Sequence, residues 1–225
     1  MLAFVALLKA RRYVNSFGQL VKGIRSFMVL DFEATCFERG HIQRQEIIEF
    51  PVILLEGQSF REIDCFHRYV RPVIRPQLSD FCTRLTGIIQ DMVDSQPTFS
   101  TIMKKFEDWV DSHFPTDKEK STFTFVTCGD WDLRFMLPYQ ASISGCQVPP
   151  YCRRWINVKK LSTFYSSTLA YTEYTGHHVD GVVPILRNLG IPHEGRLHSG
   201  IDDCRNIAKI LQFLVEKNAN LRYSE

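Results

Sequence analysis

Acidic residues are absent from this chain before Asp31. Basic side chains stand there instead, among Leu, Val and Phe. They are Lys9, Arg11, Arg12, Lys22 and Arg25. An acid-poor, basic and amphipathic start is typical of a mitochondrial presequence, and it also fits an ordinary basic helix or a frayed leader. Both interpretations of residues 1–26 stay open. A secretory signal fits poorly, because the apolar run at residues 2–8 precedes its charges instead of following them.

The chain also lacks paired cysteines and long apolar runs. Its seven cysteines are an odd number without a C-x-x-C pair, and no Cys/His spacing matches a structural zinc site. We therefore expect reduced thiols in an intracellular protein, cytoplasmic or nuclear, with a mitochondrial location as the alternative that a presequence would imply. No run of about 18 apolar residues exists, which excludes a membrane-spanning helix.

Net charge says little about a partner. A formal charge of +2 is too small to indicate nucleic-acid binding by itself, since phosphate binding depends on a concentrated basic patch. With 225 residues, 44% of them hydrophobic, the chain can bury one sizeable core. We predict a single domain at 27–219, preceded by the basic leader at 1–26 and followed by a short tail at 220–225.

Strand-like segments come first and helix-like segments follow, with one further strand between them. This order predicts an α/β domain with a mixed sheet flanked by helices. Pro51 indicates a bulge or an edge position in its strand. The predicted strands are 27–33, 46–55, 60–70 and 122–128, and the predicted helices are 79–85, 98–114, a segment after Asp130, 182–189 and 201–215. We expect a charged loop at 115–121, and irregular structure with one or two short helices at 145–181.

Asp31 and Glu33 interrupt the apolar run of the first predicted strand. Alternate side chains of a strand share a face, so the two carboxylates should point the same way with Cα atoms roughly 6–7 Å apart. They could bracket a divalent cation, because burying either one unpaired costs several kcal/mol. The alternatives are that arginine partners them or that this strand end is exposed.

Asp130 and Asp132 follow the predicted strand at 122–128. We expect Trp131 and Phe135 to anchor this segment to the core, so that one of the two acids points back at the sheet edge. The other acid would cap the following helix, which is the role we expect for Asp130.

A third element contains His198, Gly200 and Asp203. Gly200 marks a loop-to-helix transition that places Asp203 in the first helical turn and leaves His198 on the loop.

Together these elements resemble the DEDDh 3′–5′ exonucleases. The motifs are Asp31-Phe32-Glu33, Trp131-Asp132-x-x-Phe135 and His198-x-x-x-x-Asp203. The wider text DFEATC, QEIIEFPVILL, LTGIIQ and HSGIDDCRNIA is similar to the branch that contains the histone-mRNA 3′ exonuclease, its enhanced-RNA-interference relatives and snipper. The resemblance runs from about residue 27 to residue 214. It implies a ribonuclease H-like, DnaQ-type fold with a mixed five-stranded sheet flanked by helices.

The resemblance also implies the chemistry. Asp31, Glu33, Asp132 and Asp203 would bind two Mg²⁺ or Mn²⁺ ions, and His198 would be the general base. Histidine here, instead of tyrosine, selects the DEDDh subfamily. The implied reaction is hydrolysis of single-stranded RNA, and of DNA as a further substrate, from the 3′ end to nucleoside 5′-monophosphates. The alternatives are an oligoribonuclease confined to very short RNA and an RNA-binding module without turnover.

Substrate contacts are predicted near the motifs. Phe32, Ala34 and Thr35 could flank the terminal nucleotide, although Phe32 is on the strand face expected to point into the core. Trp155 lies in a run of basic and aromatic residues that would suit phosphates and stacked bases, and a solvated loop with a core tryptophan is the alternative. Arg196, two residues before His198, could hold a backbone phosphate.

Overall fold

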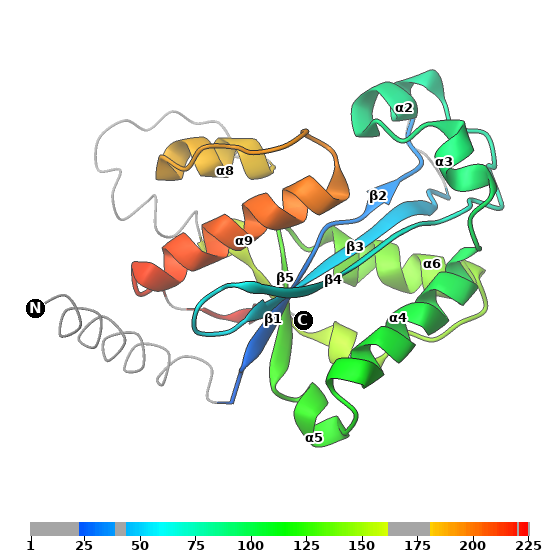
Figure 1. Ribbon diagram of the computed structural model, residues 1–225. Helices are drawn as coiled ribbons and strands as arrows, with labels where there is room; N and C mark the ends of the chain where they lie inside the picture. The colour runs from blue at the N-terminus through cyan, green and yellow to red at the C-terminus, as the bar shows by residue number, and fades with distance from the viewer. Residues whose placement is uncertain (1–22, 39–43, 162–180, 220, 225) are drawn as a thin grey trace, which may run out of the picture.

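A mixed β-sheet runs through the centre of the molecule (Figure 1). The computed structural model describes residues 23–38, 44–161, 181–219 and 221–224. The strand order is β2-β3-β1-β5-β6-β7, and β4 pairs with β3. The strands are β1 Ser26–Leu30, β2 Glu33–Ala34, β3 Ile47–Glu56, β4 Glu62–Tyr69, β5 Phe123–Thr127, β6 Trp155–Asn157 and β7 Tyr223–Ser224. The predicted mixed sheet is confirmed, and the two-residue strands β2 and β7 add to the five longer ones.

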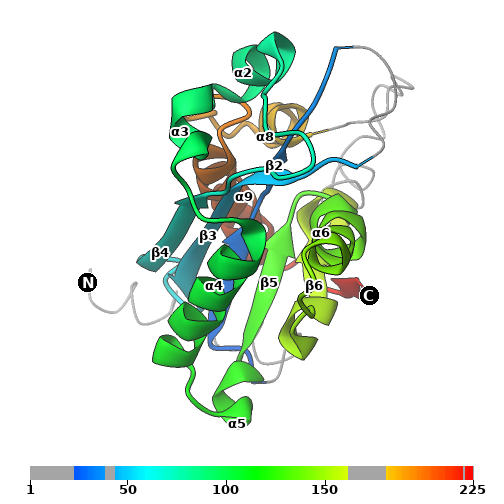
Figure 2. The same cartoon turned by 90° about the vertical axis from the view of Figure 1, so that its right-hand side faces the viewer.

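Helices cover both faces of this sheet. Figures 1 and 2 show α8 and α9 on one face and α4 and α6 on the other. None of the helices within the described residues is long and apolar enough to cross a membrane. The helices are α2 Asp80–Thr86, α3 Gln90–Asp94, α4 Phe99–His113, α5 Asp117–Lys120, the π-helix η1 Trp131–Met136, α6 Leu137–Ile143, the 3₁₀-helix η2 Pro150–Arg153, α8 Val182–Leu189 and α9 Gly200–Glu216. The predicted helices at 79–85, 98–114, 182–189 and 201–215 are confirmed.

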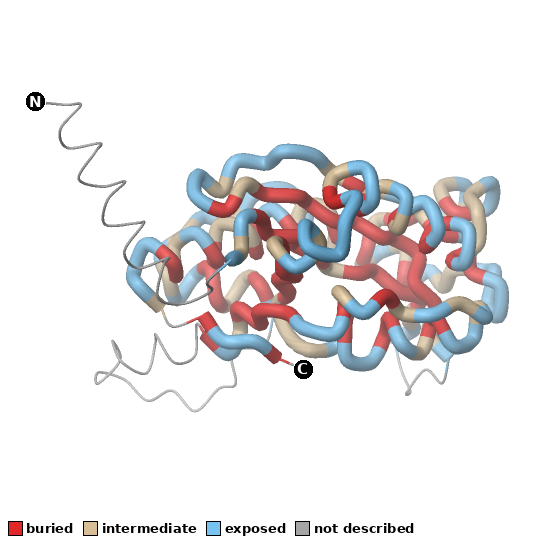
Figure 3. The backbone as a smooth tube through the Cα atoms, turned by 90° about the horizontal axis from the view of Figure 1, so that it is seen from below, coloured by how far each residue is buried: buried red, intermediate tan, exposed pale blue. Residues whose placement is uncertain are grey.

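The central strand β1 is buried on both faces. Met28 and Leu30 belong to the core cluster beneath α4, whereas Phe27 and Val29 belong to the cluster beneath α8 and α9. A strand covered on both sides has no polar face, so its sequence is continuously apolar instead of alternating. The buried residues, red in Figure 3, run through the middle of the molecule.

The predicted first strand, 27–33, is in fact two strands. β1 ends at Leu30, and β2 begins at Glu33 after two residues outside the ladder. On the neighbouring strand, Val52 pairs with Leu30 and Glu49 pairs with Glu33, so Pro51 lies opposite the break. Strand β3 is interior, and the edge position predicted from Pro51 is wrong. A proline fits here because it has no N–H to donate to a ladder that is interrupted at this point.

Three further segments differ from the sequence prediction. The predicted loop at 115–121 contains α5, which begins with a capping box between Thr116 and Glu119. The segment predicted to be irregular at 145–181 contributes the buried strand β6 in addition to η2, and the predicted tail at 220–225 contributes β7, which pairs with β6. Residues 1–22 of the predicted leader and residues 162–180 lie outside the described part of the chain.

Phe50 should be a critical core residue. Its ring lies 4.8 Å from Phe32 and 4.9 Å from Phe106, between centroids, and is 1% exposed. Phe50→Ala should lower the free energy of unfolding by about 3–5 kcal/mol, because it removes a buried ring and leaves a cavity. Urea unfolding measures this. Phe135→Ala is the control, since Phe135 is 60% exposed and its loss should cost less than about 0.5 kcal/mol. Equal losses would contradict the packing described.

Candidate active site

Asp31 and Glu33 lie at the break between β1 and β2. The ladder stops at Leu30, so Asp31 is in the unpaired link and Glu33 opens β2 opposite Glu49. The sequence had predicted that the two acids share one face of a continuous strand. In the structure they come instead from the junction between two strands. The pKa of Asp31 is raised well above its usual value, first by burial and then by the negative charges of nearby acids, Asp132 foremost.

Asp132 reaches the same junction from the end of the neighbouring parallel strand, β5. After β5, Gly129 adopts a φ of 123°, which favours glycine, and the chain enters the π-helix η1. Single-turn π-helical segments are frequent at functional sites. The carboxylate of Asp132 accepts a hydrogen bond of 2.9 Å from the backbone N–H of Phe32, and this bond ties η1 to the strand break. Burial raises the pKa of Asp132 to about 6, although that N–H opposes the rise.

Asp130 has a different role. Its carboxylate accepts hydrogen bonds from Trp155 Nε1 at 3.0 Å and Asn157 Nδ2 at 2.9 Å, and it forms an ion pair with Lys160 at 2.7 Å. Burial alone would raise the pKa of Asp130, but these partners outweigh it and lower the pKa below its usual value. Asp130 occupies the predicted N-cap position of η1, but its side chain makes no capping hydrogen bond there. Its position favours Asp132 over Asp130 as the site acid.

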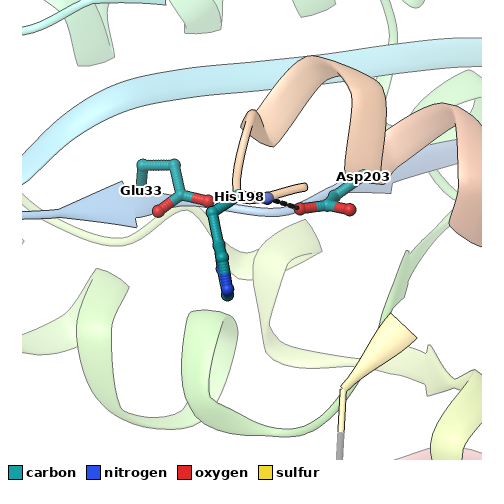
Figure 4. A group of neighbouring side chains, drawn as sticks. All are labelled: Glu33, His198 and Asp203. Atoms are coloured by element: carbon teal, nitrogen blue, oxygen red, sulfur yellow. Dashed lines mark hydrogen bonds between the residues drawn. The ribbon is translucent and has the colours of Figure 1, made fainter. Parts of the chain in front are cut away.

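His198 and Asp203 come from the start of α9 (Figure 4). The backbone N–H of His198 donates to Asp203 Oδ2 at 3.0 Å, and the Asp203 N–H donates to the Ser199 carbonyl at 2.8 Å. His198 has a φ of 58°, a left-handed conformation that costs energy outside glycine. Burial, followed by the positive charge of Arg196, lowers the pKa of His198 below its usual value, so the ring is neutral at neutral pH.

Glu33, His198 and Asp203 converge on one point. One possible ligand atom from each lies within 4.8 Å of the others, and Figure 4 shows Glu33 and Asp203 on either side of His198. Burial, followed by the charges of Glu49 and Asp203, raises the pKa of Glu33 to about 9. Burial also raises the pKa of Asp203 to about 6. Acids perturbed in this way repel one another when ionised and favour a cation between them.

The residues present fit a divalent metal. Among the residues that the structure describes, Asp203 Oδ1 is buried without a hydrogen-bond partner, although its other oxygen is bonded. A buried carboxylate oxygen without a partner is costly, and a cation would satisfy it. Asp31, Glu33, Asp132 and Asp203 offer only oxygen ligands, which suit hard ions such as Mg²⁺ or Mn²⁺.

The predicted substrate contacts beside the first motif are largely buried. Phe32 is 4% exposed and packs edge-on against Phe50, as its strand face predicted. Ala34 is 7% exposed and pairs with β3, whereas Thr35 is 3% exposed and exchanges hydrogen bonds with Glu46. These side chains build the strand beneath the site, and the structure gives them little surface to offer a nucleotide.

The structure also changes the roles predicted for residues outside the first motif. Trp155 is 2% exposed in β6 and bonded to Asp130, so it is a core residue and cannot stack on a base. The guanidinium of Arg196 donates to the Arg84 carbonyl at 2.9 Å at the end of α2, which ties the His198 segment to that helix. The predicted core anchors Trp131 and Phe135 are exposed by 39% and 60%. Their aromatic surface lies on η1 next to Asp132.

Sequence reasoning missed Glu49. This residue is 2% exposed in β3, opposite Glu33, and its carboxylate accepts hydrogen bonds from the first residues of α9. The sequence did contain a signal, since Glu49 interrupts the apolar stretch IIEFPVILL just as Asp31 interrupts its own strand. A charged residue inside a buried strand needs a partner, and here the partner is a helix terminus.

The fold and this site define an exonuclease of the DnaQ type, in which carboxylates and one histidine surround a strand break. Residues 28–211 match the family model described as an exonuclease, of the RNase T family. The chain belongs to this exonuclease family, and to its DEDDh members.

The curated relatives that it matches include ERI1-type exoribonucleases. ERI1 exoribonuclease 3 of Bos taurus is 40% identical in an alignment of 219 residues that covers 94% of this chain and 62% of that protein. Human 3′-5′ exoribonuclease 1 is 37% identical over 97% of this chain and 59% of that protein. The nuclease domain of 3′hExo, a DEDDh family member bound to rAMP, matches with a TM-score of 0.77 at 36% identity, covering 91% of this chain and 98% of that domain. The chain thus spans less than two thirds of these two full-length relatives.

Divalent cations should stabilise the protein more as the pH rises. Between the ordinary value of 4.5 and the raised value of about 9, Glu33 is more protonated in the folded protein than in the unfolded chain. The stability of the cation-free protein therefore falls as the pH rises through this window. A bound cation offsets the repulsion. Adding Mg²⁺ should raise the melting temperature more at about pH 8 than at about pH 5.5, by roughly 2–4 °C for each kcal/mol gained.

Calorimetry in EDTA and in Mg²⁺ measures this effect, and Asp31→Asn is the matched variant. Removing one repelling charge should raise its melting temperature in EDTA and weaken its response to the cation. A cation effect that is the same at both pH values, or an Asp31→Asn protein that behaves like the wild type, would contradict the electrostatic account.

Proposed function

We propose that this chain is a metal-dependent 3′–5′ exonuclease that hydrolyses single-stranded RNA, with DNA as a further substrate, to nucleoside 5′-monophosphates. The observation that carries the proposal is the convergence of Glu33, His198 and Asp203 within 4.8 Å, beside Asp31 and Asp132 at the same strand break. Membership of the exonuclease family over residues 28–211 supports the reaction type.

Asp31, Glu33, Asp132 and Asp203 would hold two Mg²⁺ or Mn²⁺ ions. When bound, a pair of such ions lowers the pKa of a water molecule and neutralises charge on the attacking and leaving oxygens of a phosphodiester. The protein's part is to hold these carboxylates rigidly on β1–β2, η1 and α9.

His198 would be the general base. Its lowered pKa keeps the ring ready to accept a proton at neutral pH. As the water oxygen attacks phosphorus, His198 takes the proton of the water, and the bond from phosphorus to the 3′ oxygen of the preceding nucleotide breaks. The products are a nucleoside 5′-monophosphate and a strand with a new 3′-hydroxyl. His198 lies on the loop before α9, and the base is therefore on a different element from Asp31, Glu33 and Asp132.

The substrate class is supported by the relatives and by one surface feature. Two full-length relatives are named exoribonucleases, and the similar solved domain holds rAMP, which is a nucleoside monophosphate. Trp131, 39% exposed and adjacent to Asp132, offers an aromatic face of the kind on which a base can stack. Trp131 therefore takes the stacking role that the sequence had suggested for Trp155.

Substitution of the site residues should abolish or strongly reduce degradation of a 5′-labelled single strand in Mg²⁺ or Mn²⁺. Asp132→Asn should remove activity because a ligand is lost, and His198→Ala should slow it by ~10²- to 10⁴-fold because the base is lost. Asp130→Asn is the matched control and should keep most of the activity, since the Asp130 carboxylate bonds to Trp155, Asn157 and Lys160. Gel analysis of the shortened strand and chromatography of the nucleotide product provide the readouts. Wild-type protein that leaves the strand intact under all these conditions would refute the proposal.

Substrate length distinguishes the proposed enzyme from the nearest alternative, an oligoribonuclease. An oligoribonuclease would degrade dinucleotides faster than long single strands, whereas the proposed enzyme shortens long strands progressively. An RNA-binding module without turnover would bind Mn²⁺ or RNA in calorimetric titration and release no nucleotide. The same protein preparation can be used for both comparisons.

A further inference from the structure

A fifth carboxylate lies beside the proposed metal ligands without belonging to them. Glu49 is 2% exposed in β3 and pairs across the ladder with Glu33. Its oxygens are already occupied by donors of this chain: Oε2 accepts from the Gly200 N–H at 3.0 Å, and Oε1 accepts from the Ile201 N–H at 3.4 Å. A carboxylate with these partners has a reason to be buried that does not involve a metal.

Glu49 caps the N-terminus of α9 from another element. The N-cap residue of this helix is Ser199, whose side chain makes no capping hydrogen bond. The two N–H groups bonded by Glu49 are those of the first helical residues, Gly200 and Ile201, which have no acceptor within the helix. A negative charge at this end also interacts favourably with the helix dipole. The N-terminus of α9 is therefore capped by a residue of β3, and not by the side chain of its own N-cap residue.

The start of α9 lies so close to the strand break that Gly200 has no room for a side chain. A Cβ atom added at Gly200 would lie 2.7 Å from the Asp31 carbonyl oxygen, 2.9 Å from Pro51 Cγ and 3.1 Å from Glu49 Oε2. The backbone of α9 is thus pressed directly against the break that carries Asp31. Close backbone approach of this kind requires glycine and makes the helix start a fixed point of the site.

Both α9 site residues depend on that fixed point. Asp203 is three residues beyond Gly200, and its N–H is bonded to the Ser199 carbonyl. His198 is two residues before Gly200, and its N–H is bonded to Asp203. A shift of Gly200 would move Asp203 and His198 together, relative to Glu33 on β2.

His67 contacts the Glu49 carboxylate from strand β4. Its Nε2 lies 2.7 Å from Glu49 Oε1, and it reaches the carboxylate from β4, where it pairs with Pro51. Its side chain is 30% exposed. The chain of contacts therefore runs from His67 on the outer strand, through Glu49, to the first turn of α9.

We propose that Glu49, oriented by His67, is a positioning residue of the nuclease site, which fixes the start of α9 so that His198 and Asp203 face Asp31 and Glu33. The inference rests on the proposed function. Glu49 contacts no substrate in this role, and its effect on the reaction passes through the backbone of Gly200 and Ile201. Partners of this kind, which orient the residues of a metal site, typically change activity by ~10- to 100-fold.

Glu46 provides a matched control. It is 3% exposed, stands next to the first residue of β3, and likewise accepts backbone hydrogen bonds, in its case from Val73, Ile74 and Arg75. Glu46→Ala therefore removes a buried carboxylate that holds backbone N–H groups elsewhere in the molecule. Any general cost of losing such a residue appears in both variants.

The first experiment measures hydrogen exchange of the α9 amides in EDTA. Glu49→Ala should increase exchange in the first turn of α9, at residues 200–203, by about tenfold or more, because two N–H groups lose their acceptor. Glu46→Ala should leave these amides at the wild-type rate. This readout needs neither metal nor activity, so it tests the positioning even if the proposed reaction proves wrong.

The second experiment measures kcat and KM on a single-stranded RNA at a temperature where all variants are folded. Glu49→Ala should lower kcat by ~10- to 100-fold with little change in KM, and Glu49→Gln should recover part of the loss because its amide oxygen can still accept one bond. His67→Ala should lower kcat less, and it serves as the test if Glu49→Ala fails to fold.

The outcomes separate the two proposals. Wild-type kcat and exchange rates in Glu49→Ala, or equal effects in Glu46→Ala, would overturn the positioning role while leaving the exonuclease proposal intact. A wild-type protein without nuclease activity would overturn the proposed function, and the exchange measurement alone would then decide the role of Glu49.

Discussion

Mutual repulsion among carboxylates in a poorly hydrated space is the constraint on which this structure depends. Asp31, Glu33, Asp132 and Asp203 come from three parts of the chain and meet at one break in the sheet, where burial raises their pKa values and neighbouring charges add to the rise for Asp31, Glu33 and Asp203. Such a cluster is unstable as a set of free anions. The surrounding fold has to supply the energy that holds it together, and the two apolar clusters on either side of β1 do so.

The fold limits this cost by giving individual acids a backbone donor. Phe32 donates to Asp132, His198 donates to Asp203, and Gly200 donates to Glu49. The bonds to Asp132 and Glu49 also join elements that are distant in sequence, so the same contacts that lower the electrostatic cost set the geometry. The buried Asp203 Oδ1 that remains without a partner shows where compensation by the protein stops and a cation becomes useful.

The aromatic residues divide between two tasks. Phe32 and Phe50 pack in the core beneath the strand break, and they make the platform rigid. Trp131 stays exposed on η1, where the π-helical turn also buries Asp132. One short segment therefore provides both a buried carboxylate and an exposed ring. This arrangement suits the proposed site, which would bind an ion and a nucleotide side by side.

Local patterns in the sequence were sufficient for strands β1, β3, β4 and β5 and for most helices, and they selected the acids proposed for the site. Ser79 and Gly87 cap α2, and the buried residues of α4 recur with helical periodicity. Signals of this kind depend on a few neighbouring residues, so the sequence could predict both helices. The acids of DFE, GDWD and HSGIDD could be selected because charge among apolar residues requires an explanation that is independent of the fold.

Only the tertiary structure decided which of these residues meet and which are shielded. It turned one predicted strand into two around Pro51, separated Asp130 from Asp132 by giving Asp130 partners on β6, buried Trp155, exposed Trp131, and brought Glu49 against the start of α9. These outcomes depend on contacts between residues up to about 150 positions apart in sequence, such as Glu49 with Gly200. No local pattern encodes such contacts, since burial and hydrogen bonding are properties of the packed chain and not of its segments.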